Sequence, residues 1–294
     1  MLARSAVPGR HDLASMEYSG SWTFQRKIDG VRVILAHEDG RVTIRGRNGS
    51  DITASFPEVS SSVSSSSSFV LDGELELVGQ STLGDLLSRV GTDRDAARNA
   101  LASPARVHAF DLLELNGSTL IRESLEVRSA ALAALVGDVN SMSFVLVPSF
   151  PGGVVLSRFS RSSRQEGIMA KRLDSLYFPG RRMGTWIKFK NTYKILCVAY
   201  AHTPGVGHGA LRLAVVDSDG DAVPVGSVGS GLRERDVAAV LAARAVRIYP
   251  VVEVSCLGIS RNGRLREPTF ITRRPDLDED AADAAQLRDL PVST

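Results

Sequence analysis

The character of the chain changes after Lys190, and this change constrains the fold more than any other feature of the sequence. Before it, two β-hairpins are predicted at residues 39–40 (Asp-Gly) and 116–117 (Asn-Gly), because such pairs suit a tight turn between alternating strands. Apolar residues with helical spacing occur at residues 83–90 and 125–135. Helices mixed with mostly antiparallel strands predict an α+β domain.

Beyond Lys190, strand-length apolar runs recur at short intervals, with one helix among them. The runs occupy residues 195–200, 211–216, 223–228 and 251–256, and the helix is expected at residues 234–243. Short strands at regular spacing predict a small all-β barrel. We therefore expect two domains, residues 1–192 and residues 193–294.

Two low-complexity segments and the histidines are given no functional role. The serine-rich tract at residues 60–68 is expected to be a surface loop or a weak helix, with no assigned function. The acidic, alanine-rich tail at residues 276–294 is expected to be a short helix or a frayed end. The histidines show no metal-ligand spacing and are interpreted as structural or exposed.

Composition excludes several classes of protein. The 294 residues are 43% hydrophobic and 23% charged, as in an ordinary folded protein. No run of about 18 apolar residues predicts a membrane span, and the first residues lack the apolar core of a secretory signal. Cys197 and Cys256 are too far apart for a short-spaced zinc motif and are expected to be buried. We expect a cytoplasmic protein with no membrane partner.

Lysine is scarce in this chain, and its positions are therefore informative. Of 35 Lys and Arg residues, only Lys27, Lys171, Lys188, Lys190 and Lys194 are lysine. Lysine, unlike arginine, can lose its proton and act as a nucleophile. The net charge of +2 does not by itself indicate a nucleic-acid partner, so any basic surface must be local.

Four of these lysines fall within a series of short motifs. The motifs are KIDGVR at residues 27–32, DGEL at 72–75, HAFDLL at 108–113, EGIMAK at 166–171 and WIKFK at 186–190. In this order, they resemble motifs I, III, IIIa, IV and V of the covalent nucleotidyltransferases, which include DNA ligases, RNA ligases and mRNA capping enzymes. The resemblance implies an adenylyltransferase (nucleotidyltransferase) domain followed by an OB-fold domain.

In such enzymes a lysine amine attacks the α-phosphate of ATP, expels pyrophosphate and carries AMP as a phosphoramidate. The resemblance makes Lys27 this catalytic nucleophile. A free lysine has a pKa of about 10.4, so neighbouring cations or burial must lower it before the amine can react. Arg32, Lys171, Lys188 and Lys190 are expected to supply those cations and to neutralise the transferring phosphate. Lys188 and Lys190 share one face of a strand, as a common target requires.

The remaining ATP- and AMP-binding residues follow from the same resemblance. Glu74 and Glu166 are expected to hold a metal ion, Mg²⁺ or alternatively Mn²⁺, because hard cations prefer carboxylate oxygens. Phe110 matches the aromatic residue that stacks on adenine. Arg47 matches an arginine that helps to hold the ribose and the 5′-phosphate of the nick.

The second domain carries one further match. Residues 263–270 and 273–276 resemble motif VI of DNA ligases, which orients the pyrophosphate leaving group. Arg266, Arg274 and Asp276 match this motif. Leu277 stands where the family often has lysine, so the strength of the pyrophosphate contact is open.

The form EGIMAK is that of DNA ligases, and the whole set resembles the small two-domain bacterial ligases. The chain is therefore expected to be an ATP-dependent DNA ligase that seals nicks in duplex DNA during repair or recombination. We expect a monomer whose partners are nicked duplex DNA and a repair-complex protein. Two alternatives remain open: an RNA ligase or capping-type nucleotidyltransferase, and a non-catalytic nucleic-acid-binding module.

Overall fold

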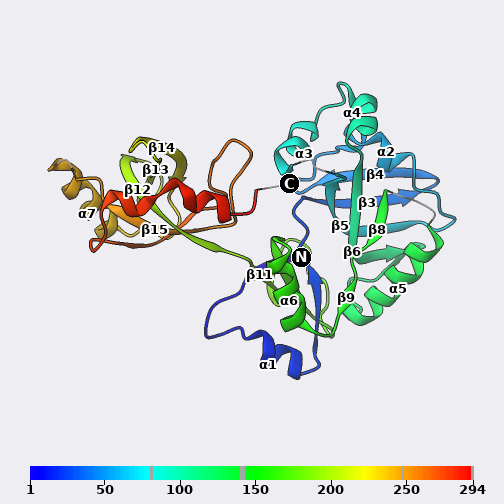
Figure 1. The fold of residues 1–294 in the computed structure, drawn as a ribbon. Helices are drawn as coiled ribbons and strands as arrows, with labels where there is room; N and C mark the ends of the chain where they lie inside the picture. Colours follow the sequence, from blue (N-terminus) through cyan, green and yellow to red (C-terminus); the bar gives the residue numbers. More distant parts are fainter. Residues whose placement is uncertain (80–81, 140–142, 247, 293–294) are drawn as a thin grey trace. The chain divides into compact units, whose positions relative to one another are not determined.

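The computed structural model describes residues 1–79, 82–139, 143–246 and 248–292. The chain folds into two compact units, Met1–Lys190 and the part from Asn191 onward (Figure 1). Each unit is described by itself below. None of the helices in the described part of the chain is long and apolar enough to cross a lipid bilayer.

The first unit contains two sheets, named sheet A and sheet B here. Sheet A has the strand order β1-β11-β10-β2-β9. Its strands are β1 (Leu2–Ser5), β2 (Trp22–Arg26), β9 (Ser149–Phe150), β10 (Gly167–Arg172) and β11 (Arg182–Lys190). All pairs are antiparallel except β1 with β11, which is parallel. Through this pair the first strand of the unit lies beside its last strand.

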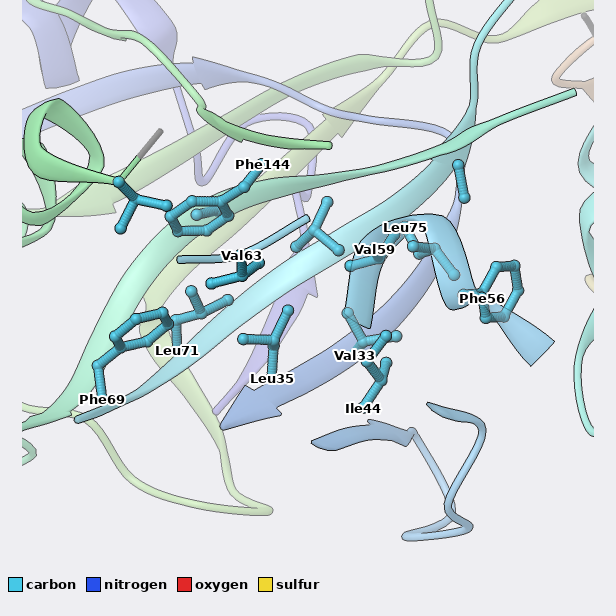
Figure 2. Close-up of a cluster of buried hydrophobic side chains, with 14 of the residues drawn as sticks. Val33, Leu35, Ile44, Phe56, Val59, Val63, Phe69, Leu71, Leu75 and Phe144 are labelled. Atoms are coloured by element: carbon cyan, nitrogen blue, oxygen red, sulfur yellow. The ribbon is translucent and has the colours of Figure 1, made fainter. Parts of the chain in front are cut away.

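Sheet B has the order β4-β3-β5-β6-β7, and a short strand β8 pairs with β6 in parallel. The strands are β3 (Val31–Glu38), β4 (Arg41–Gly46), β5 (Phe69–Leu77), β6 (Ala105–Leu115), β7 (Ser118–Thr119) and β8 (Phe144–Leu146). One face of this sheet carries the main core, in which Val33, Leu35, Leu71 and Leu75 alternate along β3 and β5 (Figure 2). Alternation buries one face and leaves the other available for polar side chains.

The helices of the first unit cover these sheets. They are α1 (Leu13–Tyr18), η1 (Thr53–Ser55), α2 (Pro57–Ser60), α3 (Leu83–Arg89), α4 (Ala96–Ala102), α5 (Leu125–Asp138) and α6 (Gly153–Ser162). The side chains of Thr82 and Ser124 accept hydrogen bonds from backbone amides at the starts of α3 and α5, a capping arrangement that satisfies otherwise unpaired N–H groups. Leu132 and Leu135 of α5 join the core on sheet B.

The second unit is a small β-structure, which we call sheet C, with the order β14-β13-β12-β15-β16. Its elements are β12 (Tyr193–Thr203), β13 (Ala210–Val216), β14 (Ala222–Val228), α7 (Glu234–Ala245), β15 (Val251–Cys256), β16 (Thr269–Arg273), η2 (Glu279–Ala282) and η3 (Ala284–Asp289). A parallel bridge between Ser230 and Thr269 links the segment after β14 to β16. The two edges of the sheet are thereby joined, as in the partly open barrel of an OB-fold.

Most expected elements are confirmed. Both predicted hairpins form, with positive φ at Asp39, Gly40, Asn116 and Gly117, and the two free cysteines are buried. The helices expected at residues 83–90, 125–135 and 234–243 correspond to α3, α5 and α7. The serine-rich tract is a loop of turns and bends after the end of α2.

The C-terminal tail is helical, as the first of its two expected alternatives has it, and not a frayed end. It forms two 3₁₀-helices, η2 and η3, and residues 293–294 lie outside the described part. Ala282 and Leu290 are buried, and Leu290 belongs to the core of the second unit. Burial of these apolar side chains therefore holds the tail against the barrel, despite its acidic composition.

Candidate active site

A pocket in the first unit is lined by residues from both of its sheets. Those from sheet A and its flanking turns are Leu2, Ala3, Gln25, Arg26, Lys27, Ile28, Met169, Lys171, Arg182, Trp186 and Lys188. Those from sheet B and its neighbouring segments are Arg32, Arg47, Glu74, Phe110 and Val147. Seven of the residues expected to bind nucleotide thus line one pocket, although they are spread over more than half of the chain.

Strand pairing in sheet A arranges residues at and beside the pocket in three parallel rows. The rows are Lys27, Gly167 and Lys190; Gln25, Met169 and Lys188; and Thr23, Lys171 and Trp186. Side chains at i and i+2 on a strand share a face, so Lys188 and Lys190 project on the same side, as expected. The first and third rows are four residues apart on β10, which corresponds to about 13 Å along the strand.

The first row contains the expected nucleophile. Lys27 Nζ donates a hydrogen bond to Glu166 Oε2 at 2.6 Å, and Lys190 Nζ lies 3.7 Å from Glu166 Oε1. The Glu166 side chain is only 6% exposed, so this ion pair is shielded from water. Glu166 therefore holds the Lys27 amine at one end of the pocket.

Arg32 is fixed on the opposite sheet by a buried carboxylate. Its Nε donates to Asp72 Oδ1 at 2.8 Å, and its Nη2 donates to Asp72 Oδ2. The Tyr177 hydroxyl donates to Asp72 Oδ2 at 2.8 Å. Bidentate pairing of this kind orients a guanidinium group rigidly, so Asp72 and Tyr177 set the direction in which Arg32 faces the pocket.

Glu74 lies across from Arg32 in the strand pairing of β3 and β5. Burial raises its pKa from the usual 4.5 to about 7, against the opposing charges of Lys27 and Arg32. The nearby charge of Glu166 adds to the increase. A divalent cation would relieve both buried carboxylates, and Mg²⁺ is commonly held by one or two carboxylates together with substrate phosphates. The donor set therefore fits the expected metal, which Glu74 and Glu166 would hold.

No ready-made metal cage accompanies them. Within residues 1–79, 82–139, 143–246 and 248–292, no three or more His, Cys, Asp or Glu side chains are grouped as a metal site. The histidines have other contacts: His108 Nε2 lies 2.8 Å from Glu76 Oε2, and His37 Nδ1 lies 2.8 Å from the Ser67 carbonyl.

Phe110 and Lys171 meet at the other end of the pocket. Lys171 Nζ lies 4.4 Å from the centroid of the Phe110 ring and 4.1 Å from that of Trp186. It donates a hydrogen bond to the Phe110 carbonyl at 3.1 Å. Burial lowers the pKa of Lys171 from 10.5 to about 7. In this structure Lys171 therefore contacts aromatic rings, whereas the sequence-based expectation grouped it with the phosphate-binding cations.

Two glycines of the motifs are required by close approach of the backbone. A Cβ atom on Gly30 would lie 2.2 Å from the Leu75 carbonyl oxygen, and one on Gly167 would lie 2.1 Å from that of Phe189. Gly30 is not among the glycines with positive φ, so a left-handed backbone conformation is not the reason for glycine here. Gly30 instead allows the segment after Lys27 to reach β5.

Several residues that line the pocket or support Arg32 beside it were not singled out from the sequence. Trp186 and Asp72 lie inside two of the motifs, and their positions were therefore available, but their contacts were not. Arg182 shares the face of Lys188 on β11, six residues away, and strand alternation could have indicated it. Tyr177 lies in no motif, and no local pattern marks it.

The expected motif VI residues belong to the second unit. Arg274 and Asp276 form a bidentate pair, with Nε to Oδ1 at 2.9 Å and Nη2 to Oδ2 at 2.7 Å. Arg274 Nη1 also lies 3.8 Å from Glu253 Oε2. The backbone of Arg266 pairs with Leu257 and Gly258. Asp276 thus orients the Arg274 side chain within its own unit.

Comparison with known proteins identifies the family. The family model for the ATP dependent DNA ligase domain matches residues 1–190. The chain is 30% identical over 289 residues to the multifunctional non-homologous end joining protein LigD of Mycolicibacterium smegmatis, covering 87% of this chain and 36% of that protein. It is 29% identical to a DNA ligase of Thermococcus fumicolans, covering 97% of this chain and 57% of that protein.

Solved structures agree with this assignment. The ligase domain of M. tuberculosis LigD has 27% sequence identity and a TM-score of 0.55, with 95% of each chain covered. A mycobacterial DNA ligase D complexed with ATP and MES has 26% identity and a TM-score of 0.54. A Lig E DNA ligase has the same fold, with a TM-score of 0.66.

The chain spans about a third of the length of the LigD proteins that it matches and just over half of the archaeal ligase. Even so, the matched ligase domain occupies most of this chain and contains the whole pocket. The chain belongs to the family of ATP-dependent DNA ligases.

Proposed function

We propose that this chain seals nicks in duplex DNA with ATP, through a covalent AMP intermediate on Lys27. The observation that carries the proposal is the ion pair of Lys27 with the nearly buried Glu166 carboxylate, at one end of a pocket that Lys188 and Arg32 also line. A lysine held in this way, with further cations facing the same space, suits phosphoryl transfer by positioning and charge neutralisation.

The first step would be attack of the neutral Lys27 amine on the α-phosphate of ATP. A bond forms between Nζ and phosphorus, and the bond from phosphorus to the bridging oxygen breaks, so pyrophosphate leaves with the electron pair. Glu166 positions the amine, and its ion pair with Lys27 must loosen before the amine can lose its proton. A bound Mg²⁺ would neutralise the phosphates and draw on the Glu74 and Glu166 carboxylates.

The later steps would use the same cations. AMP passes from Lys27 to the 5′-phosphate of the nick, and the 3′-hydroxyl then attacks that phosphate and releases AMP. Lys188, Lys190 and Arg32 would hold the phosphate oxygens throughout, while Arg47 would contact the ribose or the 5′-phosphate. Arg266, Arg274 and Asp276 of the second unit would orient the pyrophosphate during the first step.

The proposal extends to the setting of the enzyme. Its substrate would be nicked duplex DNA, and it would act as a monomer in the cytoplasm, with a repair-complex protein as partner. The LigD relatives are non-homologous end joining proteins by name, which supports a role in repair.

The deciding experiment incubates the purified chain with ATP labelled at the α-phosphate and Mg²⁺, followed by a denaturing gel and a nick-sealing assay. Lys27→Ala is the matched variant, and GTP and NAD are the nucleotide controls. Label that is retained by the wild type, lost in Lys27→Ala and chased into a sealed DNA strand is the expected result. Absence of label with all three nucleotides would refute the proposal and favour a non-catalytic binding module.

The nucleic-acid substrate is tested in the same assay by placing ribose on the 3′ or the 5′ side of the nick. We expect efficient sealing of the all-DNA nick. Sealing that occurs only with ribose at the junction would instead assign the chain to RNA end joining.

A further inference from the structure

The second unit carries a groove that the proposed chemistry does not use. It lies between the strands β12, β13 and β14 and the 3₁₀-helix η2, and residue 249 before β15 also lines it. Its volume is about 440 Å³, within the range of protein pockets that bind ligands. The lining residues belong to the second unit alone, so the groove is separate from the pocket around Lys27.

Strand pairing explains the apolar floor of the groove. Val198 and Ala214 lie opposite each other in the pair of β12 with β13. Their neighbours along the strands, Cys197 and Leu213, belong to the core of the unit, so alternation turns Val198 and Ala214 to the opposite face of the sheet. Both are nearly buried there, at 4% and 1% exposure, because η2 with its buried Ala282 packs against this face.

Two tyrosines line the groove beside this floor. Tyr200 follows Val198 on β12, and Tyr249 lies just before β15. The Pro250 carbonyl accepts a hydrogen bond from the Ala199 amide at 3.0 Å, which fixes the segment of Tyr249 next to β12. Tyr249 is 43% exposed. Tyrosine is enriched at protein interfaces, because it offers a large apolar surface with one polar end.

Carboxylates from two segments border the groove. Glu279 and Asp280 of η2 line it directly, and both are exposed. Gly220 in the turn between β13 and β14 also lines it, with the exposed Asp219 and Asp221 on either side in the chain. Among the lining residues in the described part of the chain, none is Lys, Arg or His. The groove is therefore negatively charged in a chain whose net charge is +2.

This charge determines which kind of partner fits. The phosphates of a nucleic acid would be repelled by the carboxylates, so DNA is disfavoured here. A basic peptide would gain charge complementarity at the rim and bury an apolar side chain on the floor. Its Arg or Lys side chains could also lie over the tyrosine rings.

We propose that this groove binds a segment of a partner protein in which an apolar side chain is flanked by Arg or Lys residues. The apolar side chain fills the space over Val198 and Ala214, and the flanking cations face Glu279 and Asp280. The proposal rests on the proposed function only in so far as that function includes a protein partner. It does not depend on the covalent step at Lys27.

The test measures the binding of fluorescent pentapeptides to the full chain by anisotropy. In the main panel a central Leu, Ile, Phe or Trp lies between two Arg residues on each side. One matched set has Glu in place of every Arg, and another has Gly in place of the central residue.

Three variants of the chain are compared with the wild type. Glu279→Lys with Asp280→Lys reverses the charge of the groove. Glu38→Lys with Asp93→Lys is the matched control, because it changes the net charge equally at exposed acids of the first unit. Tyr249→Ala removes part of one wall, and the exposure of this residue leaves the core unchanged.

We expect the wild type and the control variant to bind at least one peptide of the main panel equally well, and both matched sets about tenfold more weakly. The groove double variant should lose about tenfold in affinity, since two weak attractions become repulsions. Tyr249→Ala should lose about 3- to 10-fold through the missing aromatic surface. Melting temperatures equal to that of the wild type would confirm that the variants are folded.

Three results would overturn the proposal. They are a wild type that binds no peptide of the main panel, Glu peptides that bind as well as Arg peptides, and equal losses in the groove double variant and its control. Displacement of the peptides by duplex DNA, in the wild type but not in the groove double variant, would assign the groove to nucleic acid instead.

Covalent labelling and nick sealing separate this proposal from the proposed function. The groove double variant should label and seal like the wild type, because neither residue lines the pocket around Lys27. A chain that binds the peptides but takes no label would refute the ligation and leave the docking groove standing. Labelling and sealing without peptide binding would refute the docking groove alone.

Discussion

The two units of the molecule bury different kinds of side chain. In the first unit Asp72, Arg89, Asp111, Arg128 and Lys171 are all charged and buried. In the described residues of the second unit, no charged side chain is buried, and the core consists of aliphatic residues with Cys197, Cys256 and Phe270. Buried charges cost stability unless they are well paired. The first unit therefore depends on the pairing of its buried charges, of which Lys171 lines the pocket and Asp72 orients Arg32 there, while the second is an ordinary apolar barrel.

The largest expected effect is on chemistry and concerns the first unit alone. Lys27→Arg should abolish covalent transfer of AMP, because arginine keeps its proton and cannot act as the nucleophile. The guanidinium can still pair with Glu166, so the melting temperature should stay near that of the wild type. Gel labelling and thermal unfolding test this together, and retained labelling would mean that another residue carries AMP.

The next effect tests the stability cost of buried charge. Arg128 Nε and Nη2 donate to Asp111 at 2.7 and 2.9 Å, and neither side chain is exposed to solvent. Arg128→Met should lower the free energy of unfolding by roughly 3–5 kcal/mol, because it leaves a buried carboxylate unpaired. Chemical denaturation measures the loss.

Two controls sharpen this result. The double variant Arg128→Met with Asp111→Leu should recover most of the loss, since no unpaired charge remains at this site. Leu213→Ala in the second unit should lower the free energy of unfolding by about 2–5 kcal/mol, because buried packing is lost. Leu213 has no charged partner whose substitution would restore that loss. If the double variant is as unstable as Arg128→Met, the pair contributes through shape and not through charge.

A smaller effect is the pH dependence of the stability of the first unit. Glu74 and Lys171, two ionisable residues of the pocket, should cause it. The pKa of Glu74 is raised to about 7, so its contribution to stability is complete below pH 4.5 and is lost as the pH rises to about 7. The pKa of Lys171 is lowered to about 7, so its contribution is complete above pH 10.5 and is lost as the pH falls to about 7. Together they predict a minimum of stability near pH 7 without nucleotide or metal.

Denaturation between pH 5 and pH 10 measures this profile. Glu74→Gln should flatten the acid side of the minimum, and Lys171→Met should flatten the alkaline side. A profile that neither substitution changes would show that both groups titrate normally.

The smallest expected effect is in the second unit. Arg274→Ala should slow self-adenylylation by about tenfold, the scale of one charge-assisted contact to a phosphate. Sealing of a nick that is already adenylylated should be unchanged, because pyrophosphate takes no part in that step. Equal slowing of both steps would assign the second unit mainly to DNA binding.

Local patterns were sufficient for the hairpins and for α3 and α5. Asx-Gly pairs favour positive φ in themselves, and α3 and α5 carry capping residues next to their first turns. Helix α6 was not predicted from the sequence, because its first turn has no side-chain cap from the preceding residue. The Val154 amide instead donates to the side chain of Glu17 in α1, at 2.9 Å. α4 also begins without a side-chain cap, and its Leu101 is exposed, so it lacks a clear apolar stripe.

The sequence by itself singled out the residues that we propose carry the chemistry. The order and spacing of the motifs singled out Lys27, Glu74, Glu166 and Lys188, because these spacings lie within single strands or turns. Tertiary structure decided which of these groups touch. Lys27 and Glu166 are 139 residues apart, Arg32 finds Asp72 and Tyr177 from separate segments, and Lys171 turns toward Phe110. Such contacts depend on how two sheets face each other, and the energy of a buried charge depends on that packing, which no local pattern encodes.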